Sequence, residues 1–208
     1  MRQPQSIKAL EEFSRVRLSK TFFMRDFLYS DIAALKGFTN LPDAPDLAIY
    51  VGKQLCENLL EPLQEVFGRV AVRSSYRSSE VNQFGIENTP NCGSNERNHA
   101  RHIWDRRDKN GFAGATACVF LPNFYDAFPN EGDWQKLAWW IHDNLPYSSV
   151  WVFPKYWAMN INWSENPEKK IISYMPPKGT LISPSMLNSS GSHRELWKDI
   201  IPHFPKAG

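Results

Sequence analysis

Hydrophobic residues recur at helical spacing through the first third of the chain and once more in its second half. We expect a helix over each of four such segments: Ile7–Val16, Met24–Leu35, Leu47–Phe67 and Asp133–Leu145. Ser6 precedes the first segment as a capping residue, and Gly37 follows the second as a stop. Because proline lacks an N–H and clashes with the preceding turn, Pro62 should kink or divide the third helix.

Short runs rich in β-branched and aromatic residues lie between and after these segments. They predict five strands: Val70–Ser74, Ala115–Leu121, Val150–Phe153, Ala158–Trp163 and Lys170–Tyr174. Proline, glycine and serine predict an irregular stretch from Pro176 onward, followed by a short helix around His193–Ile200. Leading helices followed by mostly consecutive strands are typical of an α+β fold, here with a small, mostly antiparallel sheet backed by helices.

The composition is that of a packed globular protein. The 208 residues are 42% hydrophobic and include eight tryptophans and thirteen phenylalanines, enough for one well-buried domain. With 24 basic and 22 acidic residues the net charge is +2, which gives no electrostatic basis for binding nucleic acid. Three cysteines without CxxC spacing are expected to be free thiols: Cys56, Cys92 and Cys118.

The sequence contains no segment typical of membrane insertion or secretion. No run approaches the roughly 18 apolar residues that a membrane-spanning helix needs. The residues after Met1 form a charged amphipathic segment instead of the apolar core of a signal peptide. We therefore expect a cytoplasmic protein without a membrane partner.

The most informative polar segment is the corner Ser74-Ser75-Tyr76-Arg77-Ser78 at the end of a predicted strand. The arginine side chain carries five N–H donors in a rigid fork that suits a carboxylate or an oxyanion. Arg77 is therefore a candidate catalytic or binding residue. The alternative is a structural arginine that bridges the loop after its strand to a carbonyl or carboxylate.

Residues around this corner resemble the M15 zinc peptidases of the D-Ala-D-Ala carboxypeptidase and phage endolysin type. The matching positions are Leu60-Glu61-Pro62-Leu63, Phe67-Gly68, Ser74, Tyr76-Arg77-Ser78 and Asn82. An upstream series matches as well: Phe23, Asp26-Phe27, Ser30, Ala33, Gly37, Asn40 and Pro42. The resemblance extends over residues 20–165.

The resemblance implies a single M15 peptidase-like domain of the DD-peptidase or hedgehog type over residues 20–175. Residues 1–19 would be an N-terminal helical extension and residues 176–208 an irregular C-terminal extension with a short helix. The implied activity is hydrolysis of amide bonds in peptidoglycan-like or other small peptides that contain D-amino acids. If the protein is phage-encoded, it would meet that substrate on release at lysis.

The same resemblance implies a zinc ion held by three side chains, with one position left for water. His102 matches the first histidine best, with His99 as the alternative. Cys118 stands where the family has an aspartate, either as a thiolate ligand or as a small core residue. Asn160 or Asn162 stands where the family has its last histidine, and asparagine is a poor zinc ligand. A standard site therefore fails, and any zinc site would have to be remodelled.

Two acids are candidates for proton transfer or metal binding in such a remodelled site. Asp105 is expected to orient His102, bind the metal or act as a base, unless it pairs with Arg106 or Arg107 in a solvated loop. Glu165 is a candidate general base, unless it caps a turn before Pro167.

Other aromatic residues and histidines point less clearly to a site. Part of the tryptophan set is expected in the core: Trp139, Trp140, Trp151 and Trp157. His142, His193 and His203 are scattered along the sequence, and we expect them at the surface or at helix ends.

Three functions follow from these patterns. The first is a hydrolase with a remodelled metal site. The second is a binding module that uses the former active-site groove and Arg77 to hold a ligand with a carboxylate. The third is a structural or regulatory domain without pocket chemistry.

Overall fold

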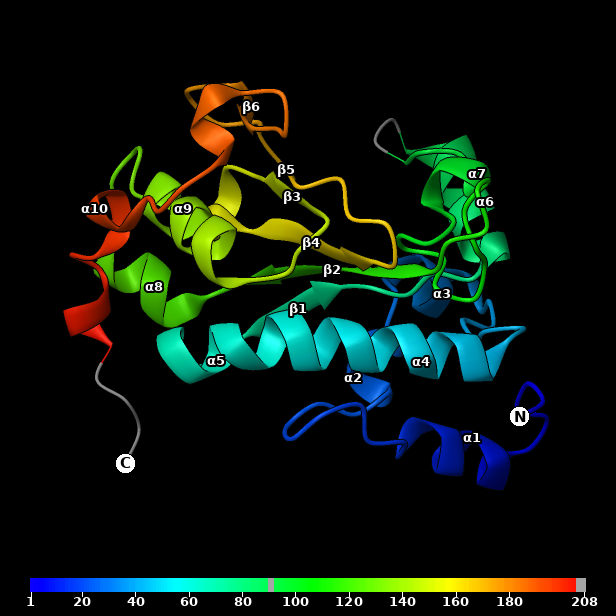
Figure 1. Ribbon diagram of the computed structural model, residues 1–208. Helices are drawn as coiled ribbons and strands as arrows, with labels where there is room; N and C mark the ends of the chain where they lie inside the picture. The colour runs from blue at the N-terminus through cyan, green and yellow to red at the C-terminus, as the bar shows by residue number, and fades with distance from the viewer. Residues whose placement is uncertain (90–91, 205–208) are drawn as a thin grey trace.

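A six-stranded sheet forms the centre of the protein, and helices back one of its faces (Figure 1). The computed structural model describes residues 1–89 and 92–204. The strand order is β1-β2-β4-β3-β5-β6, and all neighbours are antiparallel except β3 and β5, which are parallel. The expected α+β fold in a single domain is confirmed, with a mixed sheet.

All five predicted strands are present, with ends that differ from the prediction by one residue at most. They are β1 (Ala71–Ser74), β2 (Gly114–Phe120), β3 (Ser149–Val152), β4 (Met159–Ser164) and β5 (Lys170–Ser173). A sixth strand, β6 (Gly179–Ile182), pairs with β5 inside the stretch expected to be irregular. Its four residues begin with a glycine and have no clear alternation of polar and apolar residues, so no local pattern indicates a strand here.

Ten α-helices occur among the described residues. They are α1 (Ile7–Ser14), α2 (Arg25–Leu28), α3 (Asp31–Lys36), α4 (Pro45–Leu55), α5 (Glu61–Phe67), α6 (Ser79–Asn88), α7 (Asn95–Asn98), α8 (Pro122–Ala127), α9 (Trp134–Asn144) and α10 (Arg194–Trp197). Figure 1 shows α4 and α5 running alongside β1 and β2, with α6 and α7 at one end of the sheet and α8, α9 and α10 at the other. Within the described ranges, none of the helices combines the length and apolar character needed to cross a membrane.

The prediction of one helix over Met24–Leu35 is wrong, because the segment forms two short helices. Tyr29 is extended between α2 and α3, and the Ser30 hydroxyl accepts a hydrogen bond from the Ala33 N–H as the cap of α3. A serine that caps a new helix competes with continuation of the preceding one. Gly37 ends α3 in the left-handed conformation, as predicted.

The expected effect of Pro62 on the third helix takes the form of a change in helix type. Between α4 and α5, residues Cys56–Leu60 form one wide π-helical segment, η1, and Pro62 lies in the first turn of α5. Proline lacks the N–H that would bond to the carbonyl four residues earlier, and its ring clashes with that carbonyl. The wider turn before Pro62 keeps α4, η1 and α5 together as one rod.

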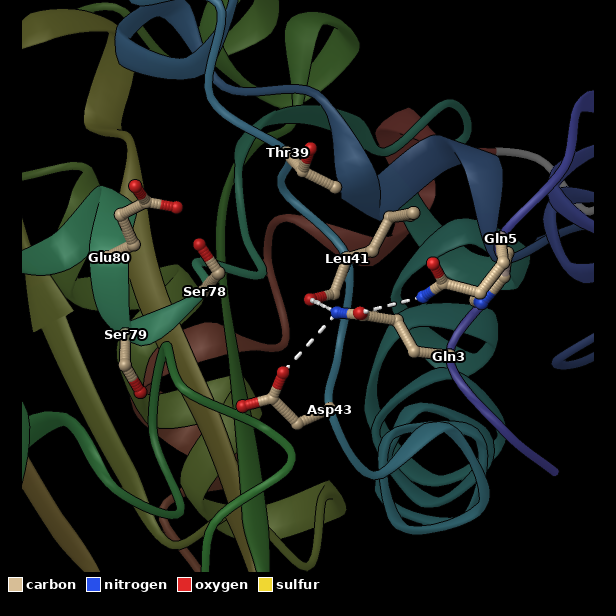
Figure 2. Close-up of a pocket in the computed structure, with 9 residues that line it drawn as sticks. Gln3, Gln5, Thr39, Leu41, Asp43, Ser78, Ser79 and Glu80 are labelled. Carbon is tan, nitrogen blue, oxygen red and sulfur yellow. Dashed lines mark hydrogen bonds between the residues drawn. The ribbon is translucent and has the colours of Figure 1, made fainter.

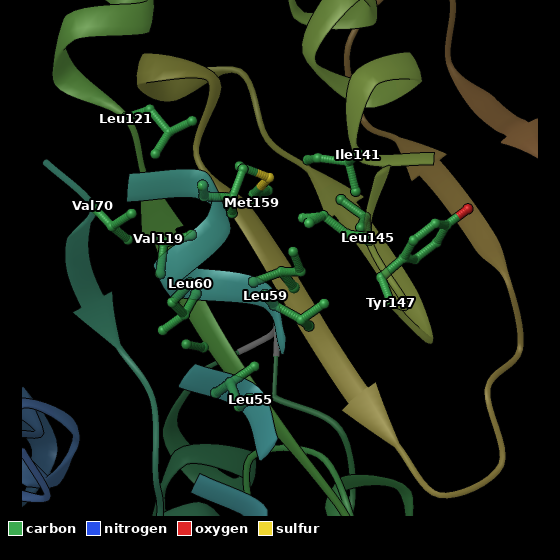
Figure 3. Packing of buried hydrophobic residues seen from close by; sticks show 14 of the residues in the cluster. Leu55, Leu59, Leu60, Val70, Val119, Leu121, Ile141, Leu145, Tyr147 and Met159 are labelled. Atoms are coloured by element: carbon green, nitrogen blue, oxygen red, sulfur yellow. The ribbon is translucent and has the colours of Figure 1, made fainter. Parts of the chain in front are cut away.

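The hydrophobic core lies between this rod and the sheet. Leu59 and Leu60 reach toward Val119 of β2 and Met159 of β4, while Ile141 approaches from α9 (Figure 3). All five side chains are at most 1% exposed. Since a buried leucine contributes roughly 1.5–3 kcal/mol, this contact fixes the rod against the sheet.

Aromatic rings join the rod to the C-terminal part of the chain. The ring of Phe67 at the end of α5 lies 4.9 Å from Trp140 of α9, 5.7 Å from Phe124 of α8 and 5.2 Å from Phe204. These edge-on contacts place α5 and α9 side by side, so both helices pack on the same face of the sheet.

Glu61 anchors the N-terminal segment to the rod. Its carboxylate is 8% exposed and accepts hydrogen bonds from the Ser19 hydroxyl at 2.7 Å and from the Thr21 N–H and hydroxyl at 2.6 and 2.9 Å. A carboxylate can be buried at this point because three donors replace its water.

Glu61→Ala should lower the free energy of unfolding by about 1–3 kcal/mol, since it leaves these donors without their partner. Glu57→Ala is the matched control, because Glu57 is exposed in the adjacent π-helical segment and should change stability by less than about 0.5 kcal/mol. Urea unfolding of both variants makes the comparison. Equal effects would contradict the anchoring role.

Candidate functional site

The candidate site lies on the face of the sheet that points away from α4 and α9. Along β2 and β4, Val119, Met159 and Ile161 point to the helices, so the residues between them point the opposite way. Cα pairing places Cys118 of β2 opposite both Ser74 and Asn160. We call this surface the distal face: Ser74, Thr116, Cys118, Trp151, Asn160 and Asn162.

A turn around Ala100 crosses one end of the distal face. Its carbonyl accepts a hydrogen bond from the Asn162 side-chain amide at 3.2 Å, and the same amide reaches the Ala115 carbonyl and the Thr116 hydroxyl at 3.0 Å each. Beneath the turn is Gly114, where a Cβ atom would lie 2.4 Å from the Ala100 oxygen. Only glycine allows this approach, so Gly114 and Asn162 together fix the turn that leads to His102.

His102 is a buried, neutral histidine on this turn. Its side chain is 7% exposed, and Nδ1 lies 2.8 Å from the Ser75 carbonyl oxygen. A carbonyl only accepts, so Nδ1 carries the proton and Nε2 keeps its lone pair. Burial lowers the His102 pKa to about 3, and the positive charge of Arg77 adds to the effect. His102 can therefore accept a proton or bind a metal through Nε2.

The backbones of Arg77 and His102 lie next to each other. The backbone N–H of Arg77 donates to the His102 carbonyl oxygen at 2.8 Å. Asn40 holds this corner, because its amide donates to the Tyr76 carbonyl at 3.1 Å and its oxygen accepts from the Ser78 N–H at 2.8 Å. Asn40, one of the positions in the family resemblance, therefore has a structural role in holding the corner.

The Arg77 guanidinium is half-buried, and its one side-chain hydrogen bond to a described residue is to Cys92 Sγ at 3.5 Å. Within residues 1–89 and 92–204, no carboxylate lies within ion-pair distance of it. The structural alternative, a bridge from Arg77 to a carboxylate, therefore has no partner in this part of the chain.

Cys118 is a partly buried thiol near the same charge. Burial raises its pKa, while Arg73 and Arg77, together with a hydrogen bond from Ser74, lower it in part. The end of β1 connects the three residues, because Ser74 pairs with Cys118, the Ser75 carbonyl contacts the His102 ring and the Arg77 backbone bonds to His102. Cys118 is neither in a disulfide nor fully in the core, and the other two cysteines are free as predicted.

Asp105 is not bonded to His102. Its side chain is 3% exposed; Oδ2 accepts from the Asp43 N–H at 2.7 Å and lies 3.6 Å from Arg106. Oδ1 and the Tyr76 hydroxyl are both buried without a hydrogen-bond partner among the described residues. Burial and the Asp105 charge raise the Tyr76 pKa. The expected pairing with Arg106 occurs, in a buried position and not in a solvated loop.

Glu165 lies away from Cys118, on the helix side of the sheet next to Tyr50 of α4. One carboxylate oxygen accepts from the Ala113 N–H at 2.8 Å and from Arg107 at 2.9 Å. The Ala113 hydrogen bond, followed by Arg107, lowers the Glu165 pKa. Its carboxylate is thereby made a weaker base and is already engaged.

The two asparagines of β4 differ. Asn162 is 3% exposed and fully engaged in holding the Ala100 turn, whereas the Asn160 side chain has no hydrogen bond to a described residue. Asn160 pairs with Cys118, so of the two asparagines it is the one beside the thiol. The alternative first histidine, His99, is half-buried beside Glu96, whose pKa it helps to lower.

Aromatic and basic side chains border the distal face. Trp151 pairs with Asn160, and its ring lies 5.7 Å from that of the exposed Tyr174, which stacks on Phe153 at 5.4 Å. Arg101 reaches Ser149 at 3.3 Å and forms an ion pair with Glu168. Trp139 and Trp140 are buried in the core as expected.

A second group of side chains was missed by the sequence analysis. His142 and Asp143 at the end of α9 and His193 before α10 each place one ligand atom within 4.8 Å of the others, so the group could hold a metal ion. His142 lies in the last turn of α9 and His193 caps α10, so the expected positions at helix ends are confirmed, but their proximity was not predicted. They are separated by 51 positions in sequence, and no spacing motif links them.

A third feature is an open polar pocket of about 490 Å³ beside the start of α6 (Figure 2). Gln3 crosses it and donates to the Leu41 carbonyl and to Asp43, both at 3.3 Å. Asp43 and Glu80 make the lining acidic. The pocket therefore does not suit the carboxylate that the distal face could hold.

Comparisons with family models, curated proteins and solved structures find no match for this chain.

Asn162→Ala should lower the free energy of unfolding by about 1–3 kcal/mol, because it leaves the buried Ala100 carbonyl without its donor. Asn160→Ala in the same strand is the control and should cost less than about 0.5 kcal/mol. Denaturant unfolding measures both. A cost for Asn160→Ala as large as that for Asn162→Ala would contradict this assignment.

The low pKa of His102 predicts a pH dependence of stability. Its pKa is about 3 in the folded protein and 6.5 when unperturbed, so the unfolded chain binds the extra proton between these values. Stability should fall as pH drops from 6.5 toward 3, by at most about 1.4 kcal/mol per pH unit from this group.

Unfolding measured from pH 7 to pH 4.5 tests this. The His102→Asn variant should lose less stability over the range than the wild type, and His99→Asn should match the wild type. A His102→Asn curve parallel to that of the wild type would show that His102 is not held neutral.

Proposed function

We propose that this chain has an M15-like fold and acts as a binding module that holds a carboxylate-bearing ligand on the distal face through Arg77. The observation that carries this proposal is the half-buried Arg77 guanidinium, for which residues 1–89 and 92–204 provide no carboxylate. A charge partly removed from water without a partner is unfavourable, and a bidentate carboxylate offsets this cost with two strong hydrogen bonds.

Neighbouring groups suit the rest of such a ligand. The Asn160 amide is not bonded to a described residue, and His102 Nε2 can accept a hydrogen bond. Arg73 adds a second positive charge near Cys118. Trp151 and Tyr174 provide an apolar border on the Asn160 side. Together they favour a short peptide with a free C-terminus, and the resemblance suggests a peptidoglycan-type stem peptide.

The same residues give weaker support to metal-dependent hydrolysis. His102 and Cys118 are two possible zinc ligands, but the residue that pairs with Cys118 on β4 is Asn160, a poor ligand. Among the described residues, the only group of three His, Cys, Asp or Glu ligand atoms lies elsewhere, at His142. The acids expected to move protons, Asp105 and Glu165, are engaged with Asp43 and Ala113.

A hydrolase with a remodelled zinc site is the second candidate. It is favoured by the tautomer of His102, whose Nδ1 proton is directed to the Ser75 carbonyl and whose Nε2 is left for a ligand. Zinc would there supply an activated water, with His102 and Cys118 as its strongest ligands.

The binding test uses a short peptide ending in D-alanine with a free carboxylate, and the same peptide with a C-terminal amide. Calorimetry should detect the carboxylate form only. Arg77→Ala should weaken its binding by about 10- to 100-fold, the range expected for a hydrogen bond to a charged group. Arg77→Lys should recover part of the affinity, since lysine keeps the charge without the fork.

Arg25→Ala is the matched control, because Arg25 is exposed on α2, and it should bind as the wild type does. Equal binding of both peptides, or an unchanged affinity in Arg77→Ala, would reject the binding proposal. Cleavage of the peptide that requires added Zn²⁺ and is abolished by His102→Ala would establish the second candidate instead.

A further inference from the structure

We propose that His142, Asp143 and His193 bind a zinc ion that fastens the C-terminal segment 183–204 to helix α9. One ligand atom from each residue lies within 4.8 Å of the other two. Zinc ligands about 2.0–2.2 Å from a tetrahedral centre are about 3.3–3.6 Å apart, so small side-chain rotations suffice. This site is separate from the distal face and does not depend on its function.

The carboxylate of Asp143 is already held between the helix and the segment. Oδ1 lies 2.7 Å from His193 Nδ1, and Oδ2 accepts from the His193 N–H at 2.7 Å and from Trp197 Nε1 at 2.8 Å. The two hydrogen bonds to Oδ2 would orient the carboxylate and stay in place while Oδ1 binds the metal. The fixed position of Asp143 reduces the ordering that binding requires.

His142 is oriented by a partner on its other nitrogen. Nδ1 lies 2.8 Å from the Tyr147 hydroxyl, while Nε2 is 3.2 Å from the Ser189 carbonyl. A carbonyl only accepts, so Nε2 carries the proton in this arrangement. Metal binding through Nε2 would replace the Ser189 contact and require the other tautomer, in which Nδ1–H donates to the Tyr147 oxygen. Tyr147 would remain as the outer partner that holds the ring.

The surroundings of His193 restrict water. Its ring stacks on Trp139 with a centroid distance of 4.4 Å and lies 5.3 Å from the His142 ring. The side chains of His193 and Asp143 are only 11% and 9% exposed. A half-enclosed set of two imidazoles and one carboxylate suits zinc better than magnesium or calcium, which prefer oxygen ligands.

The proposed consequence is a metal-dependent attachment of the C-terminal segment. Asp143 already contacts both His193 and Trp197, so the ion would add a bond between α9 and the segment at His193. Binding to the folded state alone stabilises it by mass action.

The test is titration of the full chain with Zn²⁺ and separately with Mg²⁺, after removal of bound metal. We expect one Zn²⁺ per chain and no Mg²⁺ binding. His193→Ala should lower Zn²⁺ affinity by at least about 100-fold. Asp143→Asn, which keeps the shape of the side chain, should also lower it. Zn²⁺ should slow proteolysis within residues 183–204 of the wild type but not of these two variants.

Two controls locate the ion. His203 lies in the same segment, against Phe128, and the His203→Ala variant should bind Zn²⁺ as the wild type does. His102→Ala should also leave affinity unchanged. The proposal is overturned by the absence of stoichiometric Zn²⁺ binding, by unchanged affinity in His193→Ala and Asp143→Asn, or by loss of binding in His102→Ala instead. Circular dichroism verifies that each variant is folded.

Discussion

The close approach of the Ala100 turn to the sheet at Gly114 is the contact on which the candidate site depends. Gly114 removes the side chain that would block the turn, and Asn162 bonds the turn to two neighbouring strands. This contact sets where His102 lies relative to the end of β1. Because Arg77 follows that strand end, an imidazole and a guanidinium from distant parts of the sequence share one region. The site is thus a product of sheet packing more than of any local motif.

The region around Arg77 has more positive charge than free acidic groups. Burial keeps His102 neutral, and the charge of Arg77 adds to the effect. Arg77 also partly opposes the effect of burial on Cys118, yet within the described ranges it has no acidic partner of its own. The acids nearest in sequence or resemblance are committed elsewhere, Asp105 to Asp43 and Arg106, and Glu165 to Ala113 and Arg107. A surface with an excess of positive charge and few free bases is better suited to holding an anion than to moving protons.

Patterns along the sequence predicted the regular part of the fold because burial in a sheet or against a helix imposes a period. The five predicted strands follow from this, whereas the change in the helix before Pro62 follows from the geometry of proline. Tyr29 was missed as a helix break because the Ser30 cap overrides an apolar pattern that continues through it. Arg77 and His102 meet through a long-range backbone hydrogen bond, and the side of the sheet on which Glu165 lies depends on how its strand packs; neither could be read from neighbouring residues. His142 and His193 meet only because α10 folds back on α9, a contact without a local signal.

The π-helical segment before Pro62 has a geometric consequence for the whole rod. Ala48 and Phe67 are both fully buried and lie nineteen positions apart. At about 100° per residue, an uninterrupted α-helix would rotate the second of them about 100° away from the direction of the first. One wide turn absorbs a single residue and restores the phase, so that a continuous apolar stripe faces the sheet from end to end. The π-helical segment therefore keeps the buried side of α5 aligned with the buried side of α4.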